Sequence, residues 1–415
     1  MLRAAARSGG VRKFGSITLR NMATTSGSTT TRTTRARKVK DDAEVKDKVA
    51  ESPVKKTRKP STKKPAEEDK TPTKQTKATK SKAKAEKPAD DAPKAKKARK
   101  TPAERDAGKS IFPREETKRQ LVEEGRLDKD LFKVISWNVN GLRALTRKQP
   151  TLLQELVDAE KPHIVCLQET KIQENHVDQF DKLVKGYKSF WSCSTVKKGY
   201  AGTAMFISEK FKPEEFTISY GIGLDKHEGE GRAITVRLPF CNIIALYVPN
   251  AGQDLKRLDY RTKEWDLDLR TYLRDLETET GRPCIVCGDL NVAHRDMDVW
   301  NPDAKHVPKT AGSTPEERAS FTEFLDEMKY VDAFRYLHGD VLGHFTYWSM
   351  RTNGRPFNRG NRLDYFCMPQ SIADREAKTE VPVRLFDTYV LHEPTVGVSD
   401  HCPVACIMEV TEKKE

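Results

Sequence analysis

The fold class follows from residues 131–170, which read LFKVISWNVNGLRALTRKQPTLLQELVDAEKPHIVCLQET. They begin with a short β-rich run, LFKVISW, and continue into TLLQELVDAEK, whose apolar residues recur at helical spacing. A second apolar run, HIVCLQE, is typical of a buried strand. The order predicts a strand, a helix and another strand.

The same alternation continues toward the C-terminus. Apolar residues follow a helical stripe through residues 255–279, and TPEERASFTEFLDEMKY opens with a Thr-Pro-Glu-Glu sequence typical of a helix start. Further strands are predicted for GTAMFIS, RAITVRLP, NIIALYVPN, PCIVCGDLN, RLDYFCM and HCPVACIMEV. About 285 residues of alternating strands and helices predict one layered α/β domain with a single large core.

Charge is distributed unevenly along the chain. Residues 1–110 contain 32 Lys and Arg but 13 Asp and Glu, a net charge of +19, whereas the remainder carries −5. Residues 22–110 are rich in Lys, Pro, Ala and Thr, with too few apolar residues to offset the entropy of ordering, so we expect a disordered basic tail. Such a tail is attracted to phosphates and is expected to contact DNA or chromatin. Residues 111–130 are predicted to be a linker to a domain of residues 131–410.

The N-terminus, residues 1–21, is a separate feature. It is rich in Arg, and the first acidic residue of the chain is Asp41, a composition typical of a mitochondrial transit peptide or of a plain basic arm. Met22 offers a second start, so we predict nuclear and mitochondrial forms. Basic runs such as Lys94–Arg99 are typical of nuclear import signals. No apolar stretch approaches the roughly 20 residues of a membrane span, and no membrane contact is expected.

One pattern recurs at the ends of the predicted strands, where an apolar run stops abruptly at an acid, an amide or a histidine. Strand ends in layered α/β sheets meet at one rim, so these side chains are expected to converge there. A surface loop can hold any one of them without a function, but several such strand ends are harder to dismiss. They are Asn138, Glu169, Asp289, Asn291, Asp364, Asp400 and His401.

These residue types fit phosphodiester hydrolysis. Carboxylate and amide oxygens suit Mg²⁺ or Mn²⁺, which polarises a phosphoryl oxygen and stabilises the leaving alkoxide. A base activates water, and an imidazole or a phenol donates to the phosphate oxygens. The set requires no Cys or Ser nucleophile. It therefore predicts a divalent-metal-dependent phosphodiesterase.

Six motifs occur in a fixed order: SWNVNGLRA, LQETK, YVPNAG, GDLNVAH, RLDYF and SDHCP. Together they resemble the exonuclease III family of abasic-site endonucleases, within the endonuclease/exonuclease/phosphatase superfamily, over residues 131 to 410. The resemblance implies a four-layer α/β sandwich, in which two packed mixed β-sheets are flanked by helices. It also implies double-stranded DNA with abasic sites as the substrate and Mg²⁺ or Mn²⁺ as the cofactor. We expect a monomer.

The resemblance further implies a role for each motif residue. Glu169 is the main metal carboxylate, Asn138 binds near the metal and orients the aspartate, and Asp289 is the general base or positions the attacking water. Asn291 stabilises the transition state. The metal-binding set implied in this way is Asn138, Glu169, Asp289, Asn291, Asp400 and His401.

The remaining catalytic positions concern the phosphate. The resemblance places Tyr247 against it, and Asp364 is expected to orient His401. Asp400 lies beside His401 in the sequence as a second metal ligand. Taken without their motifs, Tyr247 would be ordinary strand packing and His401 a structural histidine.

Three positions depart from the family's animal-type pattern. Asn140 replaces an aspartate, Gln253 replaces an arginine that enters the DNA, and Asn361 replaces a tryptophan of the abasic-site pocket. These changes leave the chemistry in place and put the substrate preference in doubt. Arg355 is expected to contact phosphate, and His227, like His176 and His338, to lie on the surface. The DNA-binding set is Arg143, Lys171, Asn250, Gln253, Tyr347, Trp348 and Leu363.

The predicted function is base-excision repair, with hydrolysis 5′ to an abasic site to leave a 3′-hydroxyl and a 5′-deoxyribose phosphate. Trimming of blocked 3′ ends is expected as a side activity. One alternative is a phosphoesterase of the same fold acting on a phosphoinositide or sphingomyelin head group, against which YVPNAG, RLDYF and the basic tail argue. The other is a chromatin-binding protein without catalysis, against which the full catalytic set argues.

Overall fold

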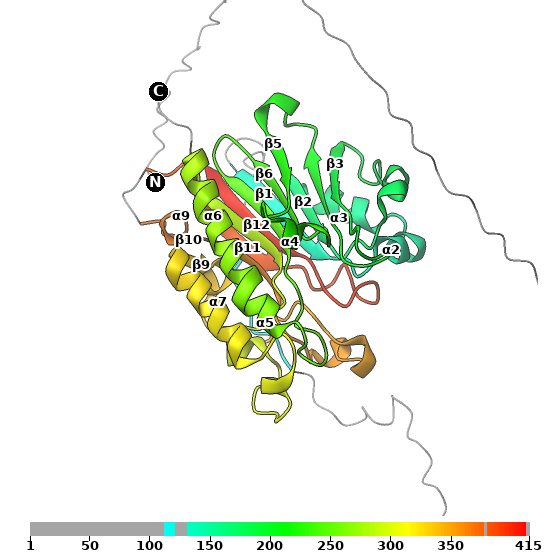
Figure 1. The fold of residues 1–415 in the computed structure, drawn as a ribbon, viewed down its shortest axis with the longest axis vertical. Coiled ribbons are helices and arrows are strands. Elements are labelled where there is room, and N and C mark those ends of the chain that lie inside the picture. The colour runs from blue at the N-terminus through cyan, green and yellow to red at the C-terminus, as the bar shows by residue number, and fades with distance from the viewer. Residues whose placement is uncertain (1–111, 121–130, 377–379, 412–415) are drawn as a thin grey trace, which may run out of the picture. The chain divides into compact units, whose positions relative to one another are not determined.

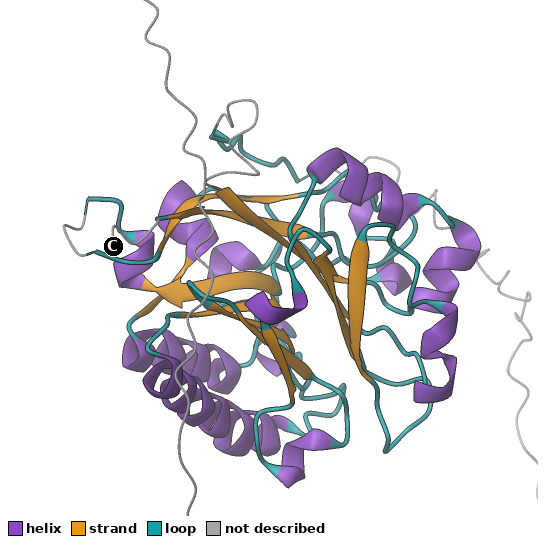
Figure 2. Cartoon of the chain, turned by 90° about the horizontal axis from the view of Figure 1, so that it is seen from above, coloured by secondary structure: helices purple, strands orange, loops and turns teal. Residues whose placement is uncertain are grey.

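The computed structural model describes residues 112–120, 131–376 and 380–411. Its architecture confirms the predicted four-layer α/β sandwich, because two six-stranded sheets pack face to face with helices on both outer sides (Figures 1 and 2). The predicted presequence, residues 1–21, and the predicted tail, residues 22–110, lie outside the described residues. No helix in the part of the chain that the structure describes is long and apolar enough to cross a membrane.

Both sheets are mixed. The first has the order β11-β12-β1-β2-β4-β3 and the second β5-β6-β7-β8-β10-β9. Each contains one parallel pair, β1 with β2 and β7 with β8, and its other pairs are antiparallel. The strands are β1 (Leu131–Asn138), β2 (Ile164–Gln168), β3 (Tyr187–Ser192), β4 (Thr203–Ser208), β5 (Thr217–Tyr220), β6 (Ala233–Arg237), β7 (Asn242–Tyr247), β8 (Cys284–Asp289), β9 (Tyr330–Asp332), β10 (Asp364–Pro369), β11 (Val383–Val390) and β12 (Val404–Val410).

The outer layers are helical. Helices α2 (Leu142–Lys148) and α3 (Leu152–Glu160) pack on the first sheet, and α6 (Asp266–Thr280) and α7 (Pro315–Met328) pack on the second. The helix predicted over 255–279 begins later, at α5 (Leu258–Tyr260), and passes through a π-helical turn, Arg261–Trp265, before α6. The remaining helices are α4 (Asp225–Glu228), α8 (Ala333–His338) and α9 (Gln370–Ala373).

Strand alternation explains how polar side chains reach the space between the sheets. Successive side chains of a strand point to opposite faces. In β1, Phe132 and Val134 belong to the core between the sheets, whereas Ile135 and Trp137 pack under the helices. Asn138, the last residue of β1, therefore continues the inward row. The same parity carries Asp289 inward at the end of β8, after Ile285 and Cys287.

The segment expected to be a linker is in part an integral piece of the domain. Within residues 112–120, the ring of Phe112 lies 5.6 Å from that of Phe345, and the amide of Glu115 donates to the carbonyl of Leu342 at 3.1 Å. A Cβ on Gly343 (φ +81) would lie 2.3 Å from the carbonyl oxygen of Pro113. A loop-like composition does not reveal such long-range docking, which is why the sequence did not predict these contacts.

Candidate active site

Sheet register brings three predicted residues side by side. Tyr247 pairs with Asp289 across β7 and β8, and Asp289 pairs with Asp364 across β8 and β10. Neighbouring strands lie about 5 Å apart, so directly opposite side chains on one face are in contact range. All three residues are at most 8% exposed. The row forms the floor of the site on the second sheet.

Asn138 joins the first sheet to this floor. Its Nδ2 donates to Oδ2 of Asp289 at 2.8 Å and to Oε1 of Glu169 at 3.1 Å, while its Oδ1 accepts from the amide of Asn140. The amide nitrogen thus holds two carboxylates in place. Its oxygen accepts one hydrogen bond and keeps a second lone pair, so the role of Asn138 near a metal stays a prediction.

Glu169 follows β2 with φ +50, a left-handed conformation that is costly for a side chain other than glycine. Lys171, also left-handed at φ +55, contacts the Glu169 carboxylate at 2.9 Å. Burial alone would raise the pKa of Glu169, but Lys171 and Asn138 outweigh it and lower the pKa below its usual value. Glu169 is therefore ionised at neutral pH.

Asp289 is almost fully buried and accepts hydrogen bonds from Asn138 and from the backbone amide of Asn291, at 2.9 Å. Burial raises the pKa of Asp289 to about 7, with a smaller opposing effect of the His401 charge. A carboxylate with this pKa can accept a proton near neutrality, as a general base must.

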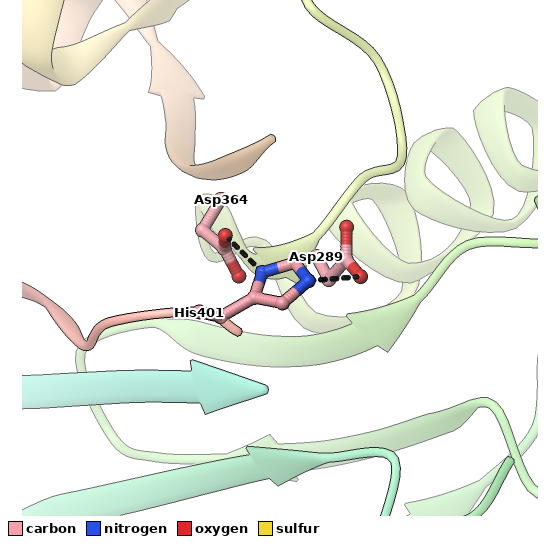
Figure 3. Close-up of side chains that lie close together, drawn as sticks. All are labelled: Asp289, Asp364 and His401. Atoms are coloured by element: carbon pink, nitrogen blue, oxygen red, sulfur yellow. Dashed lines mark hydrogen bonds and ion pairs between the residues drawn. The ribbon is translucent and has the colours of Figure 1, made fainter. Parts of the chain in front are cut away.

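His401 lies between two of the acids (Figure 3). Its Nδ1 is 2.8 Å from Oδ2 of Asp364, and its Nε2 is 3.9 Å from Oδ2 of Asp289. Burial lowers the pKa of His401, but Asp364 and Asp289 outweigh burial and raise it to about 10. The imidazole is thus charged at neutral pH, with Nδ1–H donated to Asp364 and Nε2–H facing Asp289.

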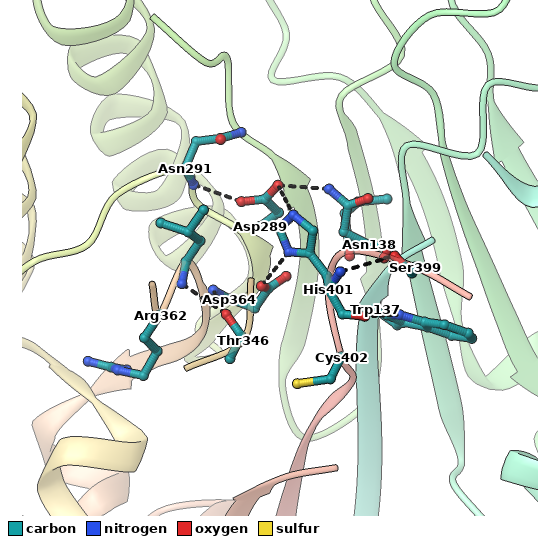
Figure 4. A network of polar contacts seen from close by, with 12 residues as sticks. Trp137, Asn138, Asp289, Asn291, Thr346, Arg362, Asp364, Ser399, His401 and Cys402 are labelled. Carbon is teal, nitrogen blue, oxygen red and sulfur yellow. Dashed lines mark hydrogen bonds and ion pairs between the residues drawn. The ribbon is translucent and has the colours of Figure 1, made fainter. Parts of the chain in front are cut away.

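Backbone contacts of His401 join this group to the rest of the site (Figure 4). The hydroxyl of Ser399 accepts from the amide of His401 at 3.1 Å and donates to the carbonyl of Asn138 at 2.8 Å. The indole of Trp137 donates to the carbonyl of His401 at 3.2 Å. Sequence reasoning missed Ser399, although its position two residues before His401 in the SDHCP region was an available signal.

Tyr247 is held by an arginine that sequence reasoning also missed. The guanidinium of Arg232 lies over the Tyr247 ring at 4.6 Å and donates to the Tyr247 carbonyl at 2.9 Å. Arg232 is itself bound by Glu230 and by the hydroxyl of Tyr200. Burial, together with the negative charge of Glu169, raises the pKa of Tyr247 well above its usual value. The phenol therefore stays protonated and can act as a hydrogen-bond donor.

Asn291 and Asn250 are bonded to each other. The Asn250 Nδ2 donates to Asn291 Oδ1 at 2.8 Å, and the Asn291 Nδ2 donates to the carbonyl of Val248 at 2.9 Å. Both amide ends of Asn291 are thus used within the protein, and its backbone amide supports Asp289. Asn250, predicted as a DNA contact, reaches the site through Asn291.

Comparison with known proteins places this geometry in a family. The model of the endonuclease/exonuclease/phosphatase family matches residues 135–401, which span β1 to His401. The chain belongs to this family.

Individual relatives of this family are similar over most of the domain. A protein named DNA-(apurinic or apyrimidinic site) endonuclease from Dictyostelium discoideum is 40% identical over 70% of this chain and 74% of its own. An exodeoxyribonuclease from Bacillus subtilis is 39% identical over 67% of this chain and 100% of its own. The crystal structure of AP endonuclease LMAP from Leishmania major matches with a TM-score of 0.63 and 33% identity, covering 72% of this chain and 93% of that one.

The residues of this family site suit a divalent cation. Carboxylate oxygens of Asp289 and Asp364 lie within 4.8 Å of each other, and Glu169 is linked to Asp289 through Asn138. Among the described residues, Oδ1 of Asp364 and Oδ1 of Asp400 are buried without a hydrogen-bond partner. Unpaired buried carboxylate oxygens are costly, and a hard cation would satisfy them.

The predicted DNA contacts differ in their exposure and in their contacts with the site. Arg143 and Gln253 are exposed, Lys171 borders the site through Glu169, and the Tyr347 ring lies 4.9 Å from the His401 ring. Leu363 is only 7% exposed and packs in a small cluster against which Tyr347 also packs. The contacts of these residues with DNA stay predictions.

The expected surface position of His227 was wrong, and Trp348 and Arg355 have partners within the protein. Trp348 is 3% exposed, with its indole donating to Asn358, so it supports a loop from within. The guanidinium of Arg355 donates to the carbonyls of His392, Thr395 and Ser399 instead of pointing outward. His227 is 4% exposed, between the hydroxyl of Tyr260 and the carboxylate of Asp268. In each case, contacts with residues distant in the sequence determine where the side chain lies.

Proposed function

We propose that this chain is a Mg²⁺- or Mn²⁺-dependent endonuclease that hydrolyses the phosphodiester 5′ to an abasic site in double-stranded DNA. The observation that carries the proposal is the convergence of Glu169, Asp289 and the Asp364–His401 pair at one rim between the sheets. Relatives with abasic-site endonuclease in their names agree with this substrate. The products would be a 3′-hydroxyl and a 5′-deoxyribose phosphate.

Asp289 takes the proton from the attacking water in this proposal. Its pKa of about 7 supports that role, since the carboxylate is then a stronger base than an exposed aspartate. Asn138 and the backbone amide of Asn291 fix its two oxygens, so one face of the carboxylate is left for the water. Orientation of this kind contributes to the rate because it removes an entropic cost.

His401 and Tyr247 stabilise the phosphate in the transition state. Both carry a proton at neutral pH, one on a charged imidazole and one on a phenol. Donors that are fixed before the reaction stabilise developing charge without reorganisation. Asp364 keeps the His401 ring oriented, and Arg232 does the same for Tyr247.

Glu169 would hold the cation, with Asp400 as a further carboxylate ligand. Their hard oxygen atoms match the preference of Mg²⁺ and Mn²⁺. When bound, the cation would polarise the phosphoryl oxygen and stabilise the leaving alkoxide. Lys171 keeps Glu169 ionised and ready to bind it.

DNA binding would combine domain and tail. Lys171 contacts Glu169, and Arg143, Lys171 and Gln253 are proposed to contact the backbone. The net charge of +19 in residues 1–110 supplies attraction that is independent of sequence. We propose a monomer with nuclear and mitochondrial forms. Imaging of tagged chains that start at Met1 and at Met22 tests the last point, and identical localisation would refute it.

The deciding experiment is incision of a labelled duplex with one tetrahydrofuran abasic analogue, in Mg²⁺ or in EDTA. Wild type should cut at the analogue only in Mg²⁺, whereas Asp289→Asn and Glu169→Gln should not. Glu160→Gln is a matched control, since this buried carboxylate pairs with Lys133 and Tyr389 away from the site. Failure to cut any DNA would favour the phosphoesterase or binding-protein alternatives.

A second activity, 3′-exonuclease, is favoured by Asn361. Asn361 and His401 each pair with Tyr347, so the Asn361 side chain shares the Tyr347 face beside the catalytic histidine. An amide at this position makes a smaller and more polar wall than a tryptophan would. Cutting of undamaged 3′ ends at a rate comparable to the analogue would establish this activity.

A further inference from the structure

Thr346 is a fully buried residue outside the six motifs, and it links the two chain segments that carry Asp364 and His401. Its backbone amide donates to the carbonyl of Asn361 at 3.0 Å. Its carbonyl accepts from the amide of Cys402, the residue after His401, at 2.9 Å. The main chain of Thr346 is thus bonded on both sides within the site.

The side chain makes the link to Asp364. The Thr346 hydroxyl oxygen accepts from two successive amides, that of Leu363 at 2.9 Å and that of Asp364 at 3.1 Å (Figure 4). A hydroxyl has two lone pairs, so one oxygen can satisfy both donors. The first residue of β10 is therefore held by a side chain.

These hydrogen bonds to the Thr346 hydroxyl matter because the Asp364 carboxylate makes few hydrogen bonds of its own. Its Oδ2 contacts His401, and its Oδ1 has no hydrogen-bond partner among the described residues. Within the described part of the chain, His401 is thus the one hydrogen-bond partner that fixes the direction of the carboxylate. His401 in turn is fixed through the amide of Cys402, which Thr346 also holds.

We propose that Thr346 is a positioning residue of the reaction, which sets the Asp364–His401 contact by holding the backbone beside both residues. The inference rests on the proposed function for its effect on cutting. The contact itself can be measured without DNA.

The test compares Thr346→Val with Thr346→Ser and with Thr388→Val in the full chain. Valine keeps the shape of threonine but removes the acceptor, and serine keeps it. Thr388 is a matched control, because it is 3% exposed in β11 and its hydroxyl donates to the carbonyl of Ala405. The concentration of folded, DNA-binding enzyme is measured by binding of the abasic duplex in EDTA, and kcat is calculated from that concentration. Partial unfolding is then not mistaken for slow chemistry.

We expect Thr346→Val to lower kcat by roughly 10- to 100-fold, as small displacements of catalytic groups do, with KM nearly unchanged. The proton resonance of His401 Nδ1–H, assigned by its absence in His401→Gln, should shift in Thr346→Val. Thr346→Ser should restore kcat and the resonance, and Thr388→Val should change neither. If Thr346→Val does not fold, Thr346→Cys replaces the acceptor by a weakly accepting sulfur.

An unshifted His401 resonance in Thr346→Val would overturn the inference, and so would a kcat equal to that of Thr388→Val. A serine variant as slow as the valine variant would do the same, because the hydroxyl would then not be the cause. Should wild type fail to cut abasic DNA, the proposed function falls, while the His401 resonance still decides whether Thr346 sets the contact.

Discussion

Tyr247 and Asp289 are neighbours on one sheet, yet burial has opposite consequences for their use. Burial keeps the phenol of Tyr247 protonated and makes the carboxylate of Asp289 a stronger base. Each residue is thereby suited to one part of the proposed reaction, one as a donor to phosphate and the other as an acceptor from water. The two residues are direct partners across the parallel strands β7 and β8.

Tyr247→Phe tests the donor half of this division. The change removes the hydroxyl and keeps the ring against Arg232. We expect kcat on abasic DNA to fall by about 10²-fold, since a single preorganised donor is worth this much or more, with little change in thermal stability. Tyr260→Phe is a control outside the site. Full activity of Tyr247→Phe would show that the phenol does not contact the phosphate.

At the level of elements, strand ends and loops carry the site, and their placement depends on close backbone contacts. Parity along β1, β7 and β8 delivers Asn138, Tyr247 and Asp289 inward, and a sequence pattern can predict that parity. The loop before β10 is different, since residues 112–120 dock on it and its own Arg355 ties it to the loop before β12. Its sequence reveals neither partner.

Gly343→Ala tests the docking of residues 112–120. A Cβ at this position would meet the carbonyl of Pro113 at 2.3 Å, and the φ of +81 disfavours any side chain. We expect a loss of about 1–3 kcal/mol in the free energy of unfolding, measured by urea denaturation. Gly281→Ala, at a helix end with φ +64 and open space around its Cβ, controls for backbone strain alone. Equal losses in both variants would argue against tight docking.

At the scale of the molecule, pH changes the stability of the fold through two histidines whose pKa values are shifted in opposite directions. Burial lowers the pKa of His392 to about 2, whereas His401 has its pKa raised to about 10. The stability from His401 is complete below its unfolded pKa of about 6.5 and is lost as pH rises through the folded value. His392 acts in the other window, because below about pH 6.5 only the unfolded chain takes up its proton.

His392→Gln should therefore flatten the loss of stability on acidification. In wild type, His392 alone removes up to about 1.4 kcal/mol per pH unit below pH 6.5, and glutamine binds no proton. The measurement is the difference in free energy of unfolding between wild type and His392→Gln from neutral pH to about pH 5. The exposed His306→Gln should follow the wild-type curve. A constant difference between wild type and His392→Gln would refute the prediction.

The basic tail is also a whole-molecule feature. Removing residues 1–110 should leave kcat nearly unchanged, because every described catalytic residue lies in the domain. Binding to duplex DNA should weaken, and the slope of its logarithm against that of the salt concentration should become shallower as phosphate contacts are lost. An unchanged slope would mean that the tail does not touch the DNA.

The sequence by itself determined a layered α/β domain, most strand and helix positions and the residues at the strand ends, and the resemblance to a family implied the four layers. Apolar periodicity and the abrupt polar residues at strand ends are properties of contiguous chain, and they can be recognised without knowing the partners. Six motifs in a fixed order indicated the family, and the comparisons with known proteins confirmed it.

Only the tertiary structure determined which side-chain atoms contact each other in the site. Asn138 and Asp289 are 151 residues apart, and nothing near either one predicts that the Asn138 nitrogen holds both Glu169 and Asp289. The burial of Trp348 and His227, the docking of residues 112–120 and the role of Thr346 are of the same kind. Each depends on partners that are distant in sequence, and burial and hydrogen bonding by such partners set both exposure and pKa.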